Sequence, residues 1–128
     1  MTVLFKSPPF AQDVDRVVVS AKPFGEVTLA RGDRVFLWWS EAQGGAGLSG
    51  HGLCASASEG PDLLRAEVEV IALRSEGVGF GRDALRPLRD ATDDGPQTSL
   101  ARKLYRHSHN KAVALTPDEE AFHDGRLR

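Results

Sequence analysis

Residues 32–41 read GDRVFLWWSE, and a glycine-rich segment, GGAGLSGHG, follows at residues 44–52. The first segment predicts a tight turn that leads into an apolar, aromatic strand, and the second predicts a loop that continues into another strand. Adjacent side chains on a strand point to opposite faces. Trp38 and Trp39 therefore cannot both be core residues on one side: one should pack inward, and the other should be covered by another element or face a cleft.

The rest of the chain predicts further strands, followed by helices. Residues 63–73 alternate between apolar and acidic side chains, which is typical of an antiparallel strand with one face in water. Thr116-Pro117, with Glu119 three residues after the threonine, is a strong signal for a helix start. The expected strands are 2–6, 17–19, 34–41, 48–58 and 63–73, and the expected helices are 99–107 and 116–125. Since no βαβ rhythm is present, the pattern predicts an α+β fold, a mostly antiparallel barrel flanked by short helices.

Length and composition indicate one globular domain over residues 1–128, with 41% hydrophobic and 27% charged residues. No apolar run is long enough to span a membrane, and the N-terminus does not read as a signal peptide. Cys54 is the one cysteine, which fits a reducing, cytoplasmic setting. The net charge of −2 argues against a protein that coats nucleic acid by bulk charge. The basic residues between 82 and 111 are either a solvated helix face or a local phosphate-facing patch.

Several local motifs are better explained by structure than by chemistry. Residues 45–50, GAGLSG, match the dinucleotide fingerprint, but a strand rather than a helix is expected after them. Cys54 and His51 should point to opposite faces of a strand, so we expect Cys54 in the core rather than paired as a nucleophile. The four histidines are too scattered for a metal cluster, and no catalytic set can be assembled. No metal and no cofactor are expected.

The order of Gly32-Asp33, an apolar strand with Trp38, a glycine-rich loop and Gly50-His51-Gly52 resembles the PUA-like superfamily, specifically its EVE-type domains. The similarity covers residues 30–75. It implies a PUA-like pseudo-barrel with an aromatic-lined pocket at its mouth, and binding of modified bases in DNA or RNA. On this resemblance, Trp38 is the carried-over pocket residue, with Ser40 and the loop at Gly44 and Gly45 nearby.

These observations favour a non-catalytic module that reads a nucleic-acid base. A flipped or single-stranded base can stack on an aromatic face for about 1–3 kcal/mol, and polar side chains then read its edge. Trp38 or Trp39 would be the platform. The candidate edge readers are Ser20, Ser40, Gln43, His109 and Asn110, and the candidate phosphate contacts are Lys22, Arg102, Arg106 and Lys111.

Two other classes of function remain open from the sequence. One is a small enzyme acting on a nucleotide or nucleic acid, with His107, His109 or His51 as general acid or base. The other is a protein-interaction module in which an exposed tryptophan is a hot spot. A reader should lose binding but keep its fold when Trp38 or Trp39 becomes alanine. An enzyme should lose its rate on changing one histidine, and an interaction module should ignore nucleic acid.

Overall fold

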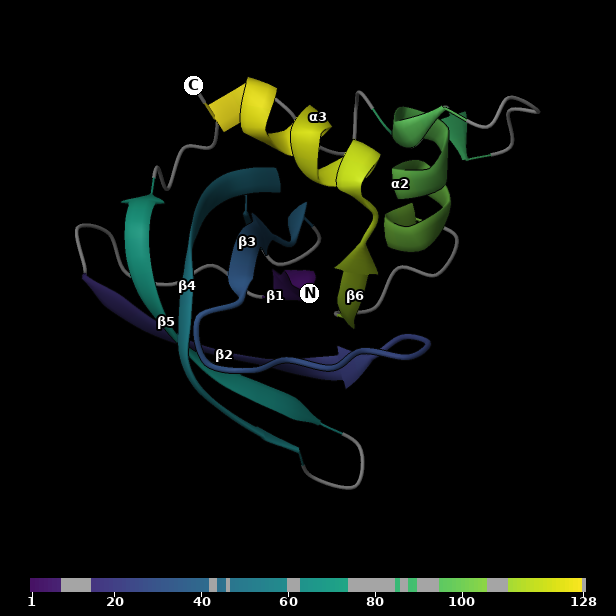
Figure 1. Ribbon diagram of the computed structural model, residues 1–128. Coiled ribbons are helices and arrows are strands. Elements are labelled where there is room, and N and C mark those ends of the chain that lie inside the picture. Colours follow the sequence, from purple (N-terminus) through teal and green to yellow (C-terminus); the bar gives the residue numbers. More distant parts are fainter. Residues whose placement is uncertain are drawn as a thin grey trace.

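A computed structural model describes residues 1–7, 15–41, 44–45, 47–59, 63–73, 85, 88–89, 95–105 and 111–127. In chain order these residues form β1 (Thr2–Ser7), β2 (Arg16–Pro23), β3 (Arg34–Trp39), β4 (Gly47–Glu59), β5 (Leu64–Leu73), α2 (Pro96–Tyr105), β6 (Lys111–Leu115) and α3 (Pro117–Leu127). The strands β1 to β5 come first in the chain, and β6 lies between α2 and α3 in sequence, an order that the colours of Figure 1 follow.

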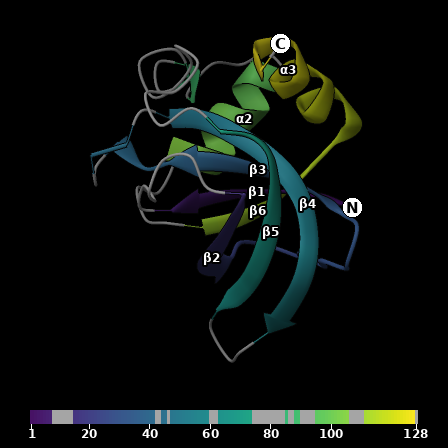
Figure 2. The ribbon, with the colours of Figure 1, turned by 90° about the vertical axis from the view of Figure 1, so that its left-hand side faces the viewer.

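The strands close into a barrel in the order β1-β3-β4-β5-β2-β6. Neighbours are antiparallel, apart from the parallel pairs β1–β3 and β2–β6. The expectation of a mostly antiparallel α+β barrel with short helices is confirmed. Figure 2 shows both helices on one side of the barrel, while the long β4–β5 hairpin curves away to the opposite end.

Two apolar clusters hold this arrangement together. The first fills the barrel, and the second lies between the outer face of the barrel and the helices. Strand β1 contributes to both by alternation: Phe5 points inward, whereas Leu4 packs outward. Because β3 lies under the helices, it is buried on both faces, with Trp39 in the inner cluster and Trp38 in the outer one.

The turn before β3 follows from Gly32 and Asp33. Gly32 has a φ of 90°, in the left-handed region that favours glycine. The Asp33 carboxylate accepts a hydrogen bond of 2.8 Å from the Ala30 N–H and contacts the N-terminal ammonium at 3.2 Å. The Ala30 hydrogen bond is the largest cause of the lowered pKa of Asp33. Gly32 and Asp33 therefore fix the direction in which the chain enters β3.

The glycines of the fingerprint-like segment serve strand packing. A Cβ on Gly50 would lie 2.3 Å from the Ala72 carbonyl oxygen, and one on Gly52 would lie 2.1 Å from that of Glu69. The β4–β5 register shifts between His51 and Gly52, so the two backbones approach closely there. Residues 47–50 belong to β4 and open no helix, which confirms that the fingerprint is coincidental.

The second half of the chain differs from expectation in three places. Helix α2 begins at Pro96, ahead of the expected start, and α3 continues through Gly125 to Leu127. Strand β6 was not expected, because residues 111–115 are short and follow a polar segment. The expected start of α3 is confirmed: the Thr116 N–H donates to Glu119 Oε1 at 2.8 Å, and the Glu119 N–H donates to Thr116 Oγ1 at 3.2 Å.

Candidate functional site

Both tryptophans are fully buried. Helices cover Trp38, whose Nε1 donates to Glu41 Oε1 at 3.2 Å and whose ring meets His123 edge-on at 6.1 Å between centroids. Trp39 lies inside the barrel. Of the two alternatives for the second tryptophan, cover by another element is the one observed. Neither indole offers a face to a base in this structure, so the expected platform on these residues needs correction.

The residues expected beside the tryptophans shape the backbone. Ser40 is buried; its N–H donates to the Ser7 carbonyl at 2.7 Å, and its carbonyl accepts from the Gly45 N–H at 2.8 Å. A Cβ on Gly45 would lie 2.5 Å from the backbone of Trp39. Gly44 has a φ of 90°. These contacts turn the chain back directly after β3. Gln43 lies outside the described residues.

Lysines form a row across the outer face of the barrel. Trp38 of β3 pairs with Lys6 of β1, Lys6 pairs with Lys111 of β6, and Lys111 pairs with Lys22 of β2. Directly paired residues point to the same face of a sheet. The structure thus brings Trp38, Lys111 and Lys22 together, with Lys6 as a member that the sequence analysis missed.

The two central lysines bind the end of helix α2. Lys6 Nζ donates to the Leu104 carbonyl at 2.9 Å, and Lys111 Nζ donates to the Lys103 carbonyl at 2.7 Å. The last carbonyls of a helix carry partial negative charge and favour cations. Both lysines are buried, so Lys111 is not open to a phosphate as expected, and its first role is structural.

The positive charge of Lys111 is poorly compensated. Burial is the main cause that lowers its pKa to about 8, and the charge of Lys6 lowers it further. The contacts of its ammonium within the described residues are the Lys103 carbonyl and the ring of Phe24, 4.9 Å from Nζ to the centroid, so no carboxylate offsets the charge. A carbonyl and a ring face offer weaker compensation than an anion would.

Phe24 is the most exposed of the described aromatic side chains. Its ring covers Lys111 on one side, yet the residue is 45% exposed. Its N–H donates to the Ala112 carbonyl at 2.9 Å, which fixes the backbone at the end of β2. Exposed Lys22 lies two residues earlier. Phe24 is not among the residues expected at the site from the sequence, although an aromatic between Pro23 and Gly25 at a strand end departs from a core pattern.

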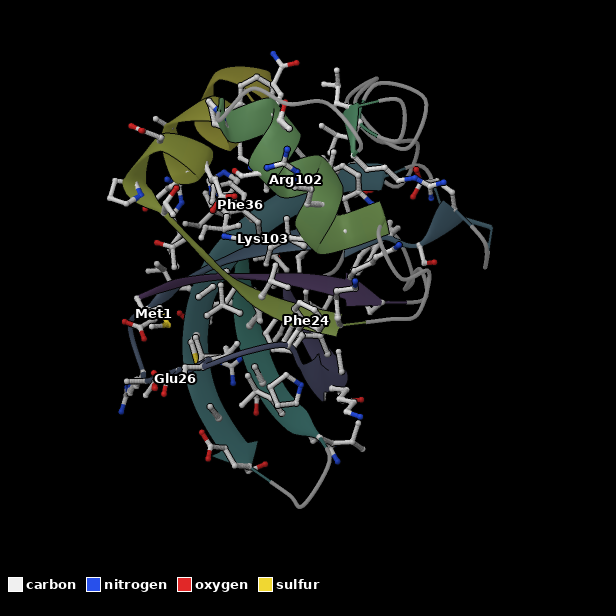
Figure 3. All side chains as sticks on the ribbon, turned by 90° about the vertical axis from the view of Figure 1, so that its right-hand side faces the viewer. Met1, Phe24, Glu26, Phe36, Arg102 and Lys103 are labelled. Atoms are coloured by element: carbon white, nitrogen blue, oxygen red, sulfur yellow. The ribbon has the colours of Figure 1, made fainter. Side chains whose placement is uncertain are left out.

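Of the remaining candidates, the structure describes Ser20 and Arg102. Ser20 is exposed, shares the outer face of β2 with Lys22 and pairs with Arg65 of β5. Arg102 is half-buried on α2, and in Figure 3 it lies above Phe24 on the side that this view presents. Arg106, His107, His109 and Asn110 lie outside the described residues. We define the Phe24 rim as Phe24, Lys22 and Ser20.

Glu119 locks the two helices together. Its carboxylate is fully buried and accepts hydrogen bonds from Ser99 Oγ at 2.7 Å and Lys103 Nζ at 2.6 Å, besides the Thr116 N–H. Burial acts to raise the pKa of Glu119, but these hydrogen bonds outweigh it and leave the pKa lowered. Since the pKa is lower in the folded state, the resulting stability is present at neutral pH and is lost as the carboxylate becomes protonated in acid.

His51 takes part in a contact between β3, β4 and α3. Arg34 Nη2 lies 3.2 Å from His51 Nδ1, and Arg34 Nη1 lies 3.4 Å from Glu120 Oε1. A guanidinium only donates, so Nδ1 accepts and the neutral ring carries its proton on Nε2. Arg34 also lies over the Phe36 ring at 4.7 Å. We assign this group to holding α3 on the barrel.

Cys54 is a core residue, as expected. It is 2% exposed within the barrel cluster, and its burial, followed by the charge of Asp33, raises the pKa of the thiol. A protonated, enclosed thiol is a poor nucleophile. The pairing of Cys54 with His51 as a catalytic couple therefore has no support.

No family model, no curated protein and no solved structure matches the chain. The part of the chain that the structure describes contains no group of three or more metal-binding side chains. In the same residues, no helix has both the length and the apolar character needed to cross a membrane.

Proposed function

We propose that the protein is a non-catalytic, PUA-like module that binds single-stranded or flipped nucleic acid at the Phe24 rim. The observation that carries the proposal is the half-exposed ring of Phe24 beside exposed Lys22, with the ammonium of Lys111, which has no carboxylate partner among the described residues, behind the ring. In this proposal Phe24 takes the role that the sequence analysis gave to the tryptophans.

The chemistry of the rim suits a nucleotide. Aromatic faces stack on bases of any sequence, and flanking cations contact the backbone phosphates. Lys22 is placed to meet a phosphate, with Ser20 one pleat away as a hydrogen-bonding group. Lys6 and Lys111 remain buried but add positive potential, and for Lys111 a phosphate would balance the charge better than a carbonyl and a ring face do.

The class of ligand follows from the resemblance and the barrel together. The closed, mostly antiparallel barrel agrees with the fold that the resemblance to EVE-type domains implies. Modified bases in DNA or RNA are the ligands expected of that family. The proposal therefore includes a modified base, such as 5-methylcytosine, as the preferred occupant.

Binding is expected to weaken about tenfold when Phe24 becomes leucine, because leucine still covers Lys111 but cannot stack on a base. Phe24→Trp should retain binding. Lys22→Gln should flatten the slope of log affinity against log salt by about 0.7, the value for one phosphate on a single strand. Fluorescence anisotropy with labelled oligonucleotides of about twelve nucleotides, with and without 5-methylcytosine, measures all three.

Arg31→Gln is the matched control for Lys22→Gln. It removes one positive charge from an exposed turn next to Asp33, away from the rim. This variant should keep the wild-type affinity and salt slope. Equal weakening by both charge variants, or full affinity in Phe24→Leu, would contradict the proposed site.

A further inference from the structure

A cavity of about 350 Å³ opens beside the Phe24 rim. The segment that follows β2 and the end of the β4–β5 hairpin line it. In Figures 1 and 2 this end of the hairpin lies on the side of the barrel away from the helices. The residues that line it are Pro23, Gly25, Glu26, Val27, Thr28, Glu59, Leu63 and Leu64. Pro23 and Gly25, the two chain neighbours of Phe24, line the cavity, whereas the Phe24 ring lies against Lys111. The volume lies in the range of small-ligand pockets.

The walls of the cavity combine apolar and acidic side chains. Val27 packs on the barrel core and Leu64 belongs to it, which gives the cavity an apolar floor. Glu26 and Glu59 are exposed and take no part in an ion pair with described residues. Glu67 and Glu69 of β5, by contrast, pair with Arg16. The cavity therefore presents unused hydrogen-bond acceptors next to an apolar surface.

The chemistry of these groups selects the occupant. An ionised carboxylate only accepts hydrogen bonds, so its partner must donate. Among bases, cytosine, adenine and guanine carry an exocyclic amino donor, and acidic side chains are known readers of the cytosine amino group. Thymine and uracil present a carbonyl oxygen at the equivalent position, which a carboxylate repels. A planar ring also fits an apolar floor.

We propose that this cavity receives one unpaired base and selects an amino-bearing base over thymine or uracil. The inference rests on the proposed function, since it needs the strand to be held at the Phe24 rim. Phe24 then stacks on the neighbouring base while Glu26 and Glu59 accept hydrogen bonds from the edge of the inserted one. Lys22 meets the phosphate between the two.

Fluorescence anisotropy with labelled oligo(dC), oligo(dA) and oligo(dT) of about twelve nucleotides tests the selection. We expect oligo(dC) or oligo(dA) to bind at least about tenfold more tightly than oligo(dT). Equal affinity for all three, or tighter binding of oligo(dT), would overturn the inference and leave the proposed function standing. Failure to bind any of them would overturn the proposed function itself.

The double variant Glu26→Gln with Glu59→Gln tests which groups select the base. A glutamine amide can donate to the thymine carbonyl, so oligo(dT) binding should rise and the preference should fall below about threefold. Asp118→Asn is the matched control, because it removes an exposed carboxylate from the first turn of α3. The Asp118→Asn variant should keep the wild-type preference for oligo(dC) or oligo(dA) over oligo(dT). A preserved preference in the double variant, shown to be folded by its urea unfolding curve, would overturn the assignment to these carboxylates.

Discussion

Trp39→Ala is expected to lower the free energy of unfolding by about 3–5 kcal/mol, the usual cost of truncating a large buried aromatic. The indole lies inside the barrel with no exposed surface, so its removal leaves a cavity that the surrounding strands cannot fill. Small domains are stable by only about 5–15 kcal/mol, and much of the protein could therefore unfold. Urea denaturation followed by circular dichroism measures the loss.

Ile71→Ala provides the control, because Ile71 is 61% exposed on β5. Its effect should stay within about 0.5 kcal/mol, as for most surface substitutions. A Trp39→Ala protein with wild-type stability would contradict the buried position of the indole. The expected loss also replaces the sequence-based expectation that this variant keeps its fold.

The second large effect is the dependence of stability on the protonation of Lys111. Its pKa is about 8 in the folded protein against 10.5 ordinarily, so between these values the unfolded chain binds more protons. Stability from this group therefore rises with pH across that window, by at most about 3 kcal/mol. Urea unfolding from about pH 7 to about pH 10 should show the rise in the wild type relative to Lys111→Met.

The difference between the two proteins is the quantity to compare. The raised pKa of the Cys54 thiol acts in the opposite direction at high pH, but it is common to both proteins and cancels in the difference. A difference that stays constant over the whole pH range would contradict a buried, uncompensated Lys111. A difference in the free energy of unfolding that begins to rise near pH 8 agrees with a buried Lys111 whose pKa is lowered.

The fold was largely predictable because its signals are local. The alternation of apolar and acidic residues in 63–73 predicted β5, and Thr116 with Glu119 predicted the start of α3. The turn at Gly32 and Asp33 gave β3. Strand β6 escaped prediction because its residues pair with β1 and β2, which are distant in the sequence, and nothing within 111–115 indicates those partners.

The candidate site was less predictable because burial is a property of the whole fold. Two adjacent tryptophans indicate that both faces of a strand are apolar, but the sequence does not reveal that helices cover one of them. Lys6 and Lys111 are buried because the end of α2 supplies carbonyl acceptors across the barrel surface. Phe24 stands out as a site residue because its ring contacts Lys111, a distant residue that only the strand register brings beside it.

The most direct test of the binding site is a titration of isotope-labelled protein with oligo(dC), followed by nuclear magnetic resonance of the amide and indole N–H signals. We predict that the signals of Lys22, Phe24 and Gly25 shift, while the indole signals of Trp38 and Trp39 stay in place. Shifts of the indole signals with an unchanged Phe24 rim would contradict the account and return the site to the tryptophans.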